Sequence, residues 1–168
     1  MMFKIKKKRP IDYILYSVVI IAGVVIDQLS KWLCVEFLKP KGSVPIIKDV
    51  IHLTYVENRG MAFGLMADAR WVFMVTSVIM IVAMGLYLYL GMCENKLYWI
   101  SVAMVVSGGI GNMIDRVALG YVVDFIDFTL IDFAVFNGAD SFVCIGAGML
   151  VLALVLDIVK EAKEKKSE

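Results

Sequence analysis

Four long apolar segments set the strongest limit on what this chain can fold into. They cover residues of about 11–38, 71–90, 97–116 and 138–159. A helix needs about 20 residues to cross the roughly 30 Å hydrocarbon core of a bilayer, and each segment reaches that length. With 61% hydrophobic residues among 168, too little polar surface is left to cover a soluble globule. The sequence therefore predicts an all-α membrane protein with four transmembrane helices, forming one domain over residues 1–168.

Basic residues flank the first and last apolar segments. They are Lys4, Lys6, Lys7, Lys8 and Arg9 before the first segment, and Lys160, Lys163, Lys165 and Lys166 after the last. Cytoplasmic flanks of membrane helices carry an excess of lysine and arginine, so we expect both termini in the cytoplasm. A cleavable signal peptide is the alternative for the first segment, but no small-residue cleavage site is evident and Asp27 and Lys31 follow at once.

Six polar side chains interrupt the apolar pattern at one end of the third and fourth segments. They are Asn112, Asp115, Arg116, Asp124, Asn137 and Asp140. At 1.5 Å per residue, Asp27 in the first segment lies about 24 Å from its inner end, which puts it at the same outer level. A charge near the bilayer centre costs about 2.5 to 3.5 kcal/mol, so polar groups that gather here indicate a functional site. A transport path would instead need acids along its length, and only Asp157 lies at the opposite end.

Helical spacing groups these side chains further. Asn112 lies three residues before Asp115, and Asn137 lies three before Asp140, so each pair shares a helix face. Small residues in the third and fourth segments, among them Gly108, Gly111 and Gly146, allow close helix packing. Two carboxylates that come within hydrogen-bonding range share one proton. One can then take a proton from water while the other protonates a peptide carbonyl. Asp115, Asp124 and Asp140 are all candidates for such a pair, and spacing does not choose two of the three.

The loop after the first span predicts a small β-sheet, which we call the β-cradle, over residues of about 42–67. Residues 50–56 alternate in a strand-like way, with Ile51, Leu53 and Tyr55 on one face and His52 towards solvent. Unpaired backbone groups are not tolerated in hydrocarbon, so the sheet should lie on the outer membrane surface. It could hold an extended peptide by strand pairing, or serve only as a lid or spacer.

Other chemistries find little support. One histidine and three cysteines show no metal-ligand spacing and no Ser/His or Cys/His arrangement, so neither a metal site nor a disulfide framework is expected. The net charge of +1 decides nothing about partners. A small proton-coupled transporter or channel subunit, or a non-enzymatic assembly factor, remains an alternative.

Five short segments follow one another in a fixed order along the spans. They are residues 27–31 (DQLSK), 57–64 (ENRGMAFG), 108–116 (GGIGNMIDR), 122–125 (VVDF) and 136–141 (FNGADS). In this order they resemble the motifs of the lipoprotein signal peptidase family, also called signal peptidase II. The resemblance implies a bacterial inner-membrane aspartic endopeptidase, with an outer-face β-cradle and a short extracytoplasmic helix. Such an enzyme cleaves lipid-modified prolipoproteins just before the cysteine that carries diacylglycerol.

The resemblance also implies roles for individual residues. The catalytic pair falls on Asp124 and Asp140, with Asp27 and Lys31 as support from the first helix. Polar residues that bind the substrate or support the site fall on Asn58, Gly60, Asn112, Asp115, Arg116 and Asn137. No metal, organic cofactor or nucleic acid is implied, the protein is expected to act as a monomer in contact with membrane lipid, and the cyclic peptide globomycin is expected to inhibit it. Asp124 is expected on a short outer connection in which Asp127 and Asp132 are solvated loop charges.

Overall fold

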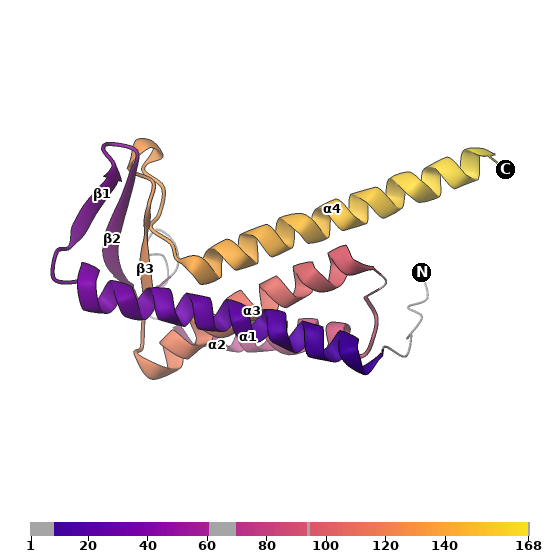
Figure 1. The fold of residues 1–168 in the computed structure, drawn as a ribbon, viewed down its shortest axis with the longest axis horizontal. Helices are drawn as coiled ribbons and strands as arrows, with labels where there is room; N and C mark the ends of the chain where they lie inside the picture. The colour runs from indigo at the N-terminus through magenta and orange to yellow at the C-terminus, as the bar shows by residue number, and fades with distance from the viewer. Residues whose placement is uncertain (1–8, 61–69, 94, 168) are drawn as a thin grey trace.

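The computed structural model describes residues 9–60, 70–93 and 95–167, which form four long helices and one small sheet (Figure 1). The elements are α1 (Pro10–Leu33), its π-helical continuation η1 (Cys34–Leu38), β1 (Ser43–Ile47), β2 (Ile51–Asn58), α2 (Arg70–Tyr89), α3 (Lys96–Ala118), β3 (Val122–Asp127), the 3-10 turn η4 (Thr129–Ile131) and α4 (Gly138–Ser167). The sheet lies across one end of the helices, and the start of α1 and the C-terminal end of α4 lie at the other (Figure 1).

Three helices in the described part of the chain are long and apolar enough to cross a membrane. They cover Pro10–Leu38, Lys96–Ala118 and Gly138–Lys166. The apolar part of α2, Met74–Tyr89, is shorter. The structure is therefore that of a mostly helical membrane protein, as expected, with three of the four expected crossings supported by length and composition; the fourth stays a prediction.

Helix α3 is the centre of the bundle, because it packs against α1, α2 and α4. The apolar core lies towards the end with the chain termini and includes Tyr16, Leu88 and Val102. At the other end, a Cβ on Gly108 of α3 would collide with the backbone oxygen of Ala139 at the start of α4. The absence of a side chain there brings the two helices into direct contact, as membrane helices with small residues allow.

The three strands form an antiparallel sheet in the order β1-β2-β3. Strands β1 and β2 fall within the expected cradle, whose residues 61–67 lie outside the described part of the chain. Strand β3 was not expected, and its register places Asp124 opposite Val56 of β2 rather than on a loop. Aspartate is disfavoured in β-strands. Here, however, the Asp124 carboxylate accepts hydrogen bonds from neighbouring side-chain amides. Cys34 and Leu38 from η1 pack against Val123 and Phe125, which fixes the sheet to the bundle.

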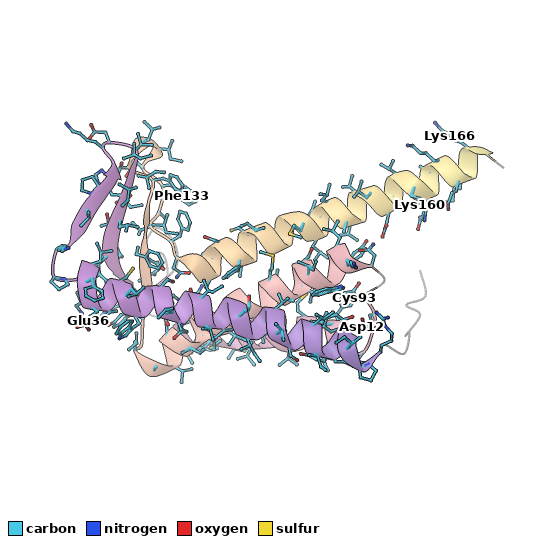
Figure 2. All side chains as sticks on the ribbon, viewed as in Figure 1. Asp12, Glu36, Cys93, Phe133, Lys160 and Lys166 are labelled. Atoms are coloured by element: carbon cyan, nitrogen blue, oxygen red, sulfur yellow. The ribbon has the colours of Figure 1, made fainter. Side chains whose placement is uncertain are left out.

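The segment between β3 and α4 differs from the expected short helix. It contains only the single 3-10 turn η4, after which Phe136 pairs with Ile126 through two backbone hydrogen bonds of 2.8 and 3.0 Å. Asp127 lies on β3 and accepts a hydrogen bond of 2.7 Å from Thr54, so it is not a solvated loop charge, whereas Asp132 is exposed. The return along β3 places Asn137, the residue before α4, directly beside Asp124. Figure 2 shows Phe133 at this end of the molecule and Lys160 and Lys166 far along α4.

Candidate active site

The start of α4 is held by a reciprocal capping arrangement. The Asn137 side-chain oxygen accepts a hydrogen bond from the Asp140 backbone N–H at 2.9 Å. The Asp140 carboxylate accepts one from the Asn137 backbone N–H at 3.3 Å. This is the geometry of a capping box, with asparagine and aspartate in the two roles, and it satisfies N–H groups that have no partner inside the helix. A carboxylate is also favoured at this positive end of the helix.

Both candidate carboxylates are hydrogen-bonded by side-chain amides, of which those of Asn112 and Asn137 are buried and that of Asn58 is half-buried. Asn137 Nδ2 donates to Asp124 Oδ1 at 2.6 Å, and Asn58 Nδ2 donates to the other Asp124 oxygen at 2.8 Å. Asn112 Nδ2 donates to Asp140 Oδ1 at 2.7 Å. Because Asn137 contacts both aspartates, β3 and α4 bring the two carboxylates into one polar site. Asp124 is only 1% exposed, whereas Asp140 is half-buried and therefore accessible to a ligand.

The two carboxylates influence one another electrostatically. Burial raises the pKa of Asp124 to about 6, and the charge of Asp140 acts in the same direction. Hydrogen bonds from Asn58 and Asn137 favour the ionised form and oppose this rise in the pKa. Asp124 is therefore the group that holds a proton near neutral pH more readily than an ordinary carboxyl does.

A buried lysine lies behind the pair. The Lys31 ammonium of α1 is 3% exposed and contacts Asp27 at 2.9 Å and Asp115 at 3.0 Å. Its third contact, at 2.9 Å, is the side-chain oxygen of Asn112. An ammonium can only donate, so this contact fixes the Asn112 amide with its nitrogen towards Asp140.

Asp115 is distinguished from the pair by its partners. Its carboxylate accepts hydrogen bonds from Lys31 and from the backbone N–H of Val123 at 3.1 Å, which ties the end of α3 to β3. Asp27 binds the backbone N–H of Ala139 at 2.8 Å in the same manner. These contacts are those of groups that hold the backbone in place. A Cβ on Gly111 would collide with the Asp27 carboxylate, so glycine is required where α1 crosses α3.

Two further predicted site residues, Gly60 and Arg116, donate hydrogen bonds to the asparagines of the site. The Gly60 backbone N–H donates to the Asn58 side-chain oxygen at 3.1 Å, which turns the Asn58 nitrogen towards Asp124. Arg116 donates to the backbone oxygen of Asn112, one turn earlier in α3, at 3.3 Å. Every predicted site residue therefore lies in or beside one network. Gln28 also belongs to this network. The sequence analysis assigned no role to Gln28, although it lies inside the first motif.

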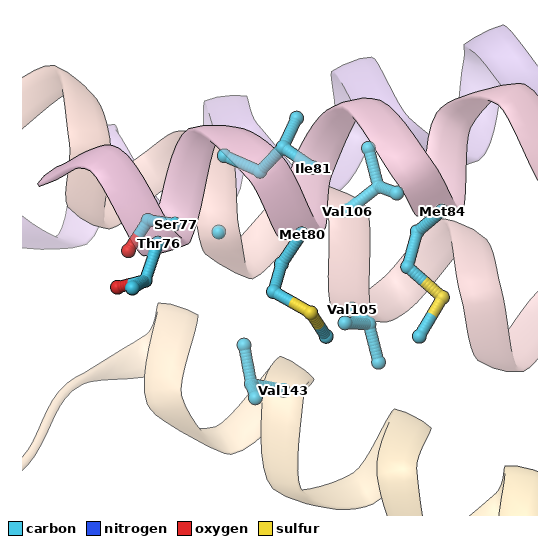
Figure 3. Close-up of a pocket in the computed structure, with 9 residues that line it drawn as sticks. Thr76, Ser77, Met80, Ile81, Met84, Val105, Val106 and Val143 are labelled. Carbon is cyan, nitrogen blue, oxygen red and sulfur yellow. The ribbon is translucent and has the colours of Figure 1, made fainter. Parts of the chain in front are cut away.

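An apolar cavity of about 250 Å³ opens next to this network, between α2, α3 and α4 (Figure 3). Met80 and Met84 line it from α2, Val105 from α3 and Val143 from α4. Val143 lies three residues after Asp140, so the cavity begins about one helical turn from the carboxylate. Apolar groups of a ligand thus have room within the membrane-embedded part of the molecule.

Fold and site together define a class: a multi-pass membrane protein with two carboxylates, one buried and one half-buried, that are joined by Asn137 at one end of its helices. The family model of signal peptidase II matches residues 19–156. A lipoprotein signal peptidase of Caldanaerobacter subterraneus is 50% identical over 135 residues, which cover 80% of this chain and 92% of that protein. One of Clostridioides difficile is 43% identical and covers 82% and 93%. The chain belongs to the signal peptidase II family, and it is thus a bacterial membrane protease.

Solved structures agree with this fold. One structure, described as a bacterial membrane enzyme, superposes with a TM-score of 0.77 at 28% identity, covering 86% of this chain and 89% of the other. A second with the same description gives a TM-score of 0.73 at 28% identity, covering 83% and 92%. The alternative of a proton-coupled transporter or channel subunit is not supported by these relatives.

Proposed function

We propose that this protein is an aspartic endopeptidase that removes the signal peptide of diacylglyceryl-modified prolipoproteins, with Asp124 and Asp140 as the catalytic pair. The observation that carries the proposal is that one residue, Asn137, hydrogen-bonds both carboxylates, at 2.6 and 3.3 Å. The family to which the chain belongs supplies the substrate class, which is lipoprotein precursors.

The arrangement supports a reaction in which the pair holds one proton. Asp140 removes a proton from a water molecule, whose oxygen attacks the carbonyl carbon, while Asp124 gives its proton to the carbonyl oxygen. When the C–N bond then breaks, the leaving amine takes the proton from Asp140, and the hydroxyl of the intermediate returns one to Asp124. The raised pKa of Asp124 supports its role as the initial acid.

The proposed orientation places both termini in the cytoplasm and the carboxylates towards the outer face. The start of α1 and the lysine-rich end of α4 lie at one end of the bundle and the sheet lies at the other (Figure 1). A lipidated substrate keeps its acyl chains in the bilayer, so it enters sideways between helices, and the apolar cavity beside Val143 is at the right depth to receive apolar groups. The same proposal includes a β-cradle that holds the peptide and a protein that acts as a monomer.

A cleavage assay with purified protein tests the proposed function. We expect a diacylglyceryl-modified precursor to be cut directly before its modified cysteine, and the same precursor without lipid to be cut far more slowly. The reason is that binding energy from the acyl chains helps to hold the peptide bond at the carboxylates. Mass spectrometry of the products identifies the bond. Equal cleavage of both forms, or cleavage elsewhere, would contradict the proposal.

The pKa of Asp124 gives the reaction a predicted pH dependence. The pair needs its shared proton, and that proton is lost as the pH rises through about 6. The free enzyme determines kcat/KM, so kcat/KM should fall by about tenfold per pH unit above this value. Initial rates at low substrate concentration, taken from about pH 5 to about pH 8, measure this dependence of kcat/KM on pH. A kcat/KM that rose across this range would show that the ionised form of Asp124 is the active one.

A further inference from the structure

The residue before each catalytic aspartate is held by a carboxylate from another helix. Asp27 of α1 accepts the backbone N–H of Ala139, which precedes Asp140, at 2.8 Å. Asp115 of α3 accepts the backbone N–H of Val123, which precedes Asp124, at 3.1 Å. The positions of β3 and of the first turn of α4 therefore depend on where these two supporting carboxylates lie.

Gln28 joins the two supporting carboxylates. Its Nε2 atom donates to Asp115 Oδ1 at 2.9 Å and lies 3.2 Å from Asp27 Oδ2. The same nitrogen lies 3.1 Å from the backbone oxygen of Gly111, which lies against the Asp27 side chain. Gln28 thus connects α1 to α3 and touches the groups that hold both β3 and α4.

Lys31 does not replace this connection. Lys31 contacts the Oδ2 atoms of both carboxylates, whereas Gln28 contacts the Oδ1 atom of Asp115. A carboxylate held through one oxygen can turn about its Cβ–Cγ bond, and one held through both cannot. An ammonium is also a point charge with rotatable donors, while the planar amide of glutamine donates in fixed directions. The orientation of Asp115, and with it the hydrogen bond to Val123, needs both donors.

We propose that Gln28 is a positioning residue that sets the separation of Asp124 and Asp140 through Asp115, Asp27 and the backbone N–H groups of Val123 and Ala139. This inference rests on the proposed function of the pair. Gln28 contacts neither of the two aspartates in the described structure, and its effect on cleavage is indirect.

The test replaces Gln28 with methionine, which keeps the length of the side chain and removes its hydrogen bonds. We expect kcat for the lipidated precursor to fall by about 10- to 100-fold, the cost of a displacement of roughly 1 Å at a reacting centre, with KM unchanged. Amide hydrogen exchange provides a readout independent of activity. The N–H group of Val123 should exchange faster in Gln28→Met than in the parent protein, and that of Ala139 should change less, because Asp27 stays held through both oxygens by Ala139 and Lys31.

Tyr98→Phe is the matched control. It removes a hydrogen bond of 2.6 Å between the buried Tyr98 and Asp157, far from the site, and should leave kcat and the exchange of Val123 and Ala139 unchanged. The inference is overturned if Gln28→Met keeps the parent kcat, if only KM changes, if exchange at Val123 and Ala139 is unaltered, or if Tyr98→Phe lowers kcat equally. Failure of the parent protein to cleave the lipidated precursor would overturn the proposed function as well, so the two failures are distinguishable.

Discussion

Asp124→Asn and Asp140→Asn should each reduce cleavage of a lipidated precursor to the background rate, a loss of about 10⁴-fold. Asparagine has nearly the shape of aspartate but cannot take up or release the shared proton. Either change therefore removes both halves of the acid–base chemistry, because the carboxylates act as one unit. The measurement is a single-turnover assay with excess enzyme, which detects slow cleavage.

The same variants should be expressed and inserted into the membrane at near-normal levels, because asparagine has nearly the volume of aspartate and keeps one acceptor oxygen, so that only part of the hydrogen bonding to the neighbouring amides is lost. Asp127→Asn is the matched control, since Asp127 lies on the same strand but bonds to Thr54 on β2. It should cleave at close to the parent rate. Retained turnover in both Asp124→Asn and Asp140→Asn would refute the catalytic assignment and favour a non-enzymatic role.

The general position of the site could be predicted from sequence because the membrane limits where polar groups are tolerated. Counting residues along apolar helices gives depth directly, and it placed Asp27 and Asp115 at one level. In the structure these two side chains contact the same buried lysine. The spacing of Asn137 and Asp140, which the sequence analysis interpreted as a shared helix face, is also a local signal for the cap of α4.

Strand β3 could not be predicted in the same way. Its pairing with β2 joins Asn58 to Asp124, 66 positions apart, and no local pattern reports such a register. For that reason spacing left three aspartates as candidates for the pair. The choice against Asp115 depends on its contact with the Val123 backbone, which exists only once β3 has formed. Gln28 was missed because a single glutamine on an apolar helix has no distinctive spacing.

Lys31→Met should cause the largest loss of stability among single changes around the site, about 3 to 5 kcal/mol. Methionine preserves most of the volume of the lysine side chain but removes the charge between Asp27 and Asp115, which are 0% and 3% exposed. Two buried carboxylates then face each other without a cation, and each has lost a short contact. Breaking a buried ion pair from one side is costly because the remaining charges stay desolvated.

Thermal unfolding in detergent measures this loss, and the midpoint should fall on the order of 10 °C. A thiol-reactive dye can report unfolding in a Cys144→Ser background, because Cys34 and Cys93 are buried in the folded protein whereas Cys144 is exposed. Lys39→Met serves as the control, since Lys39 also pairs with a carboxylate but its side chain is 48% exposed. Exposed ion pairs contribute little to stability, so its midpoint should stay close to that of the parent.

A second substitution distinguishes charge imbalance from lost packing. If the cost of Lys31→Met comes from unpaired carboxylates, adding Asp115→Asn should raise the midpoint above that of Lys31→Met alone, although Asp115→Asn is destabilising by itself. The neutral amide relieves the repulsion with Asp27 and can still accept the Val123 N–H. If the cost comes from packing, the two losses will add. Lys31→Met that unfolds at the same temperature as Lys39→Met would contradict a structural role for the buried ammonium altogether.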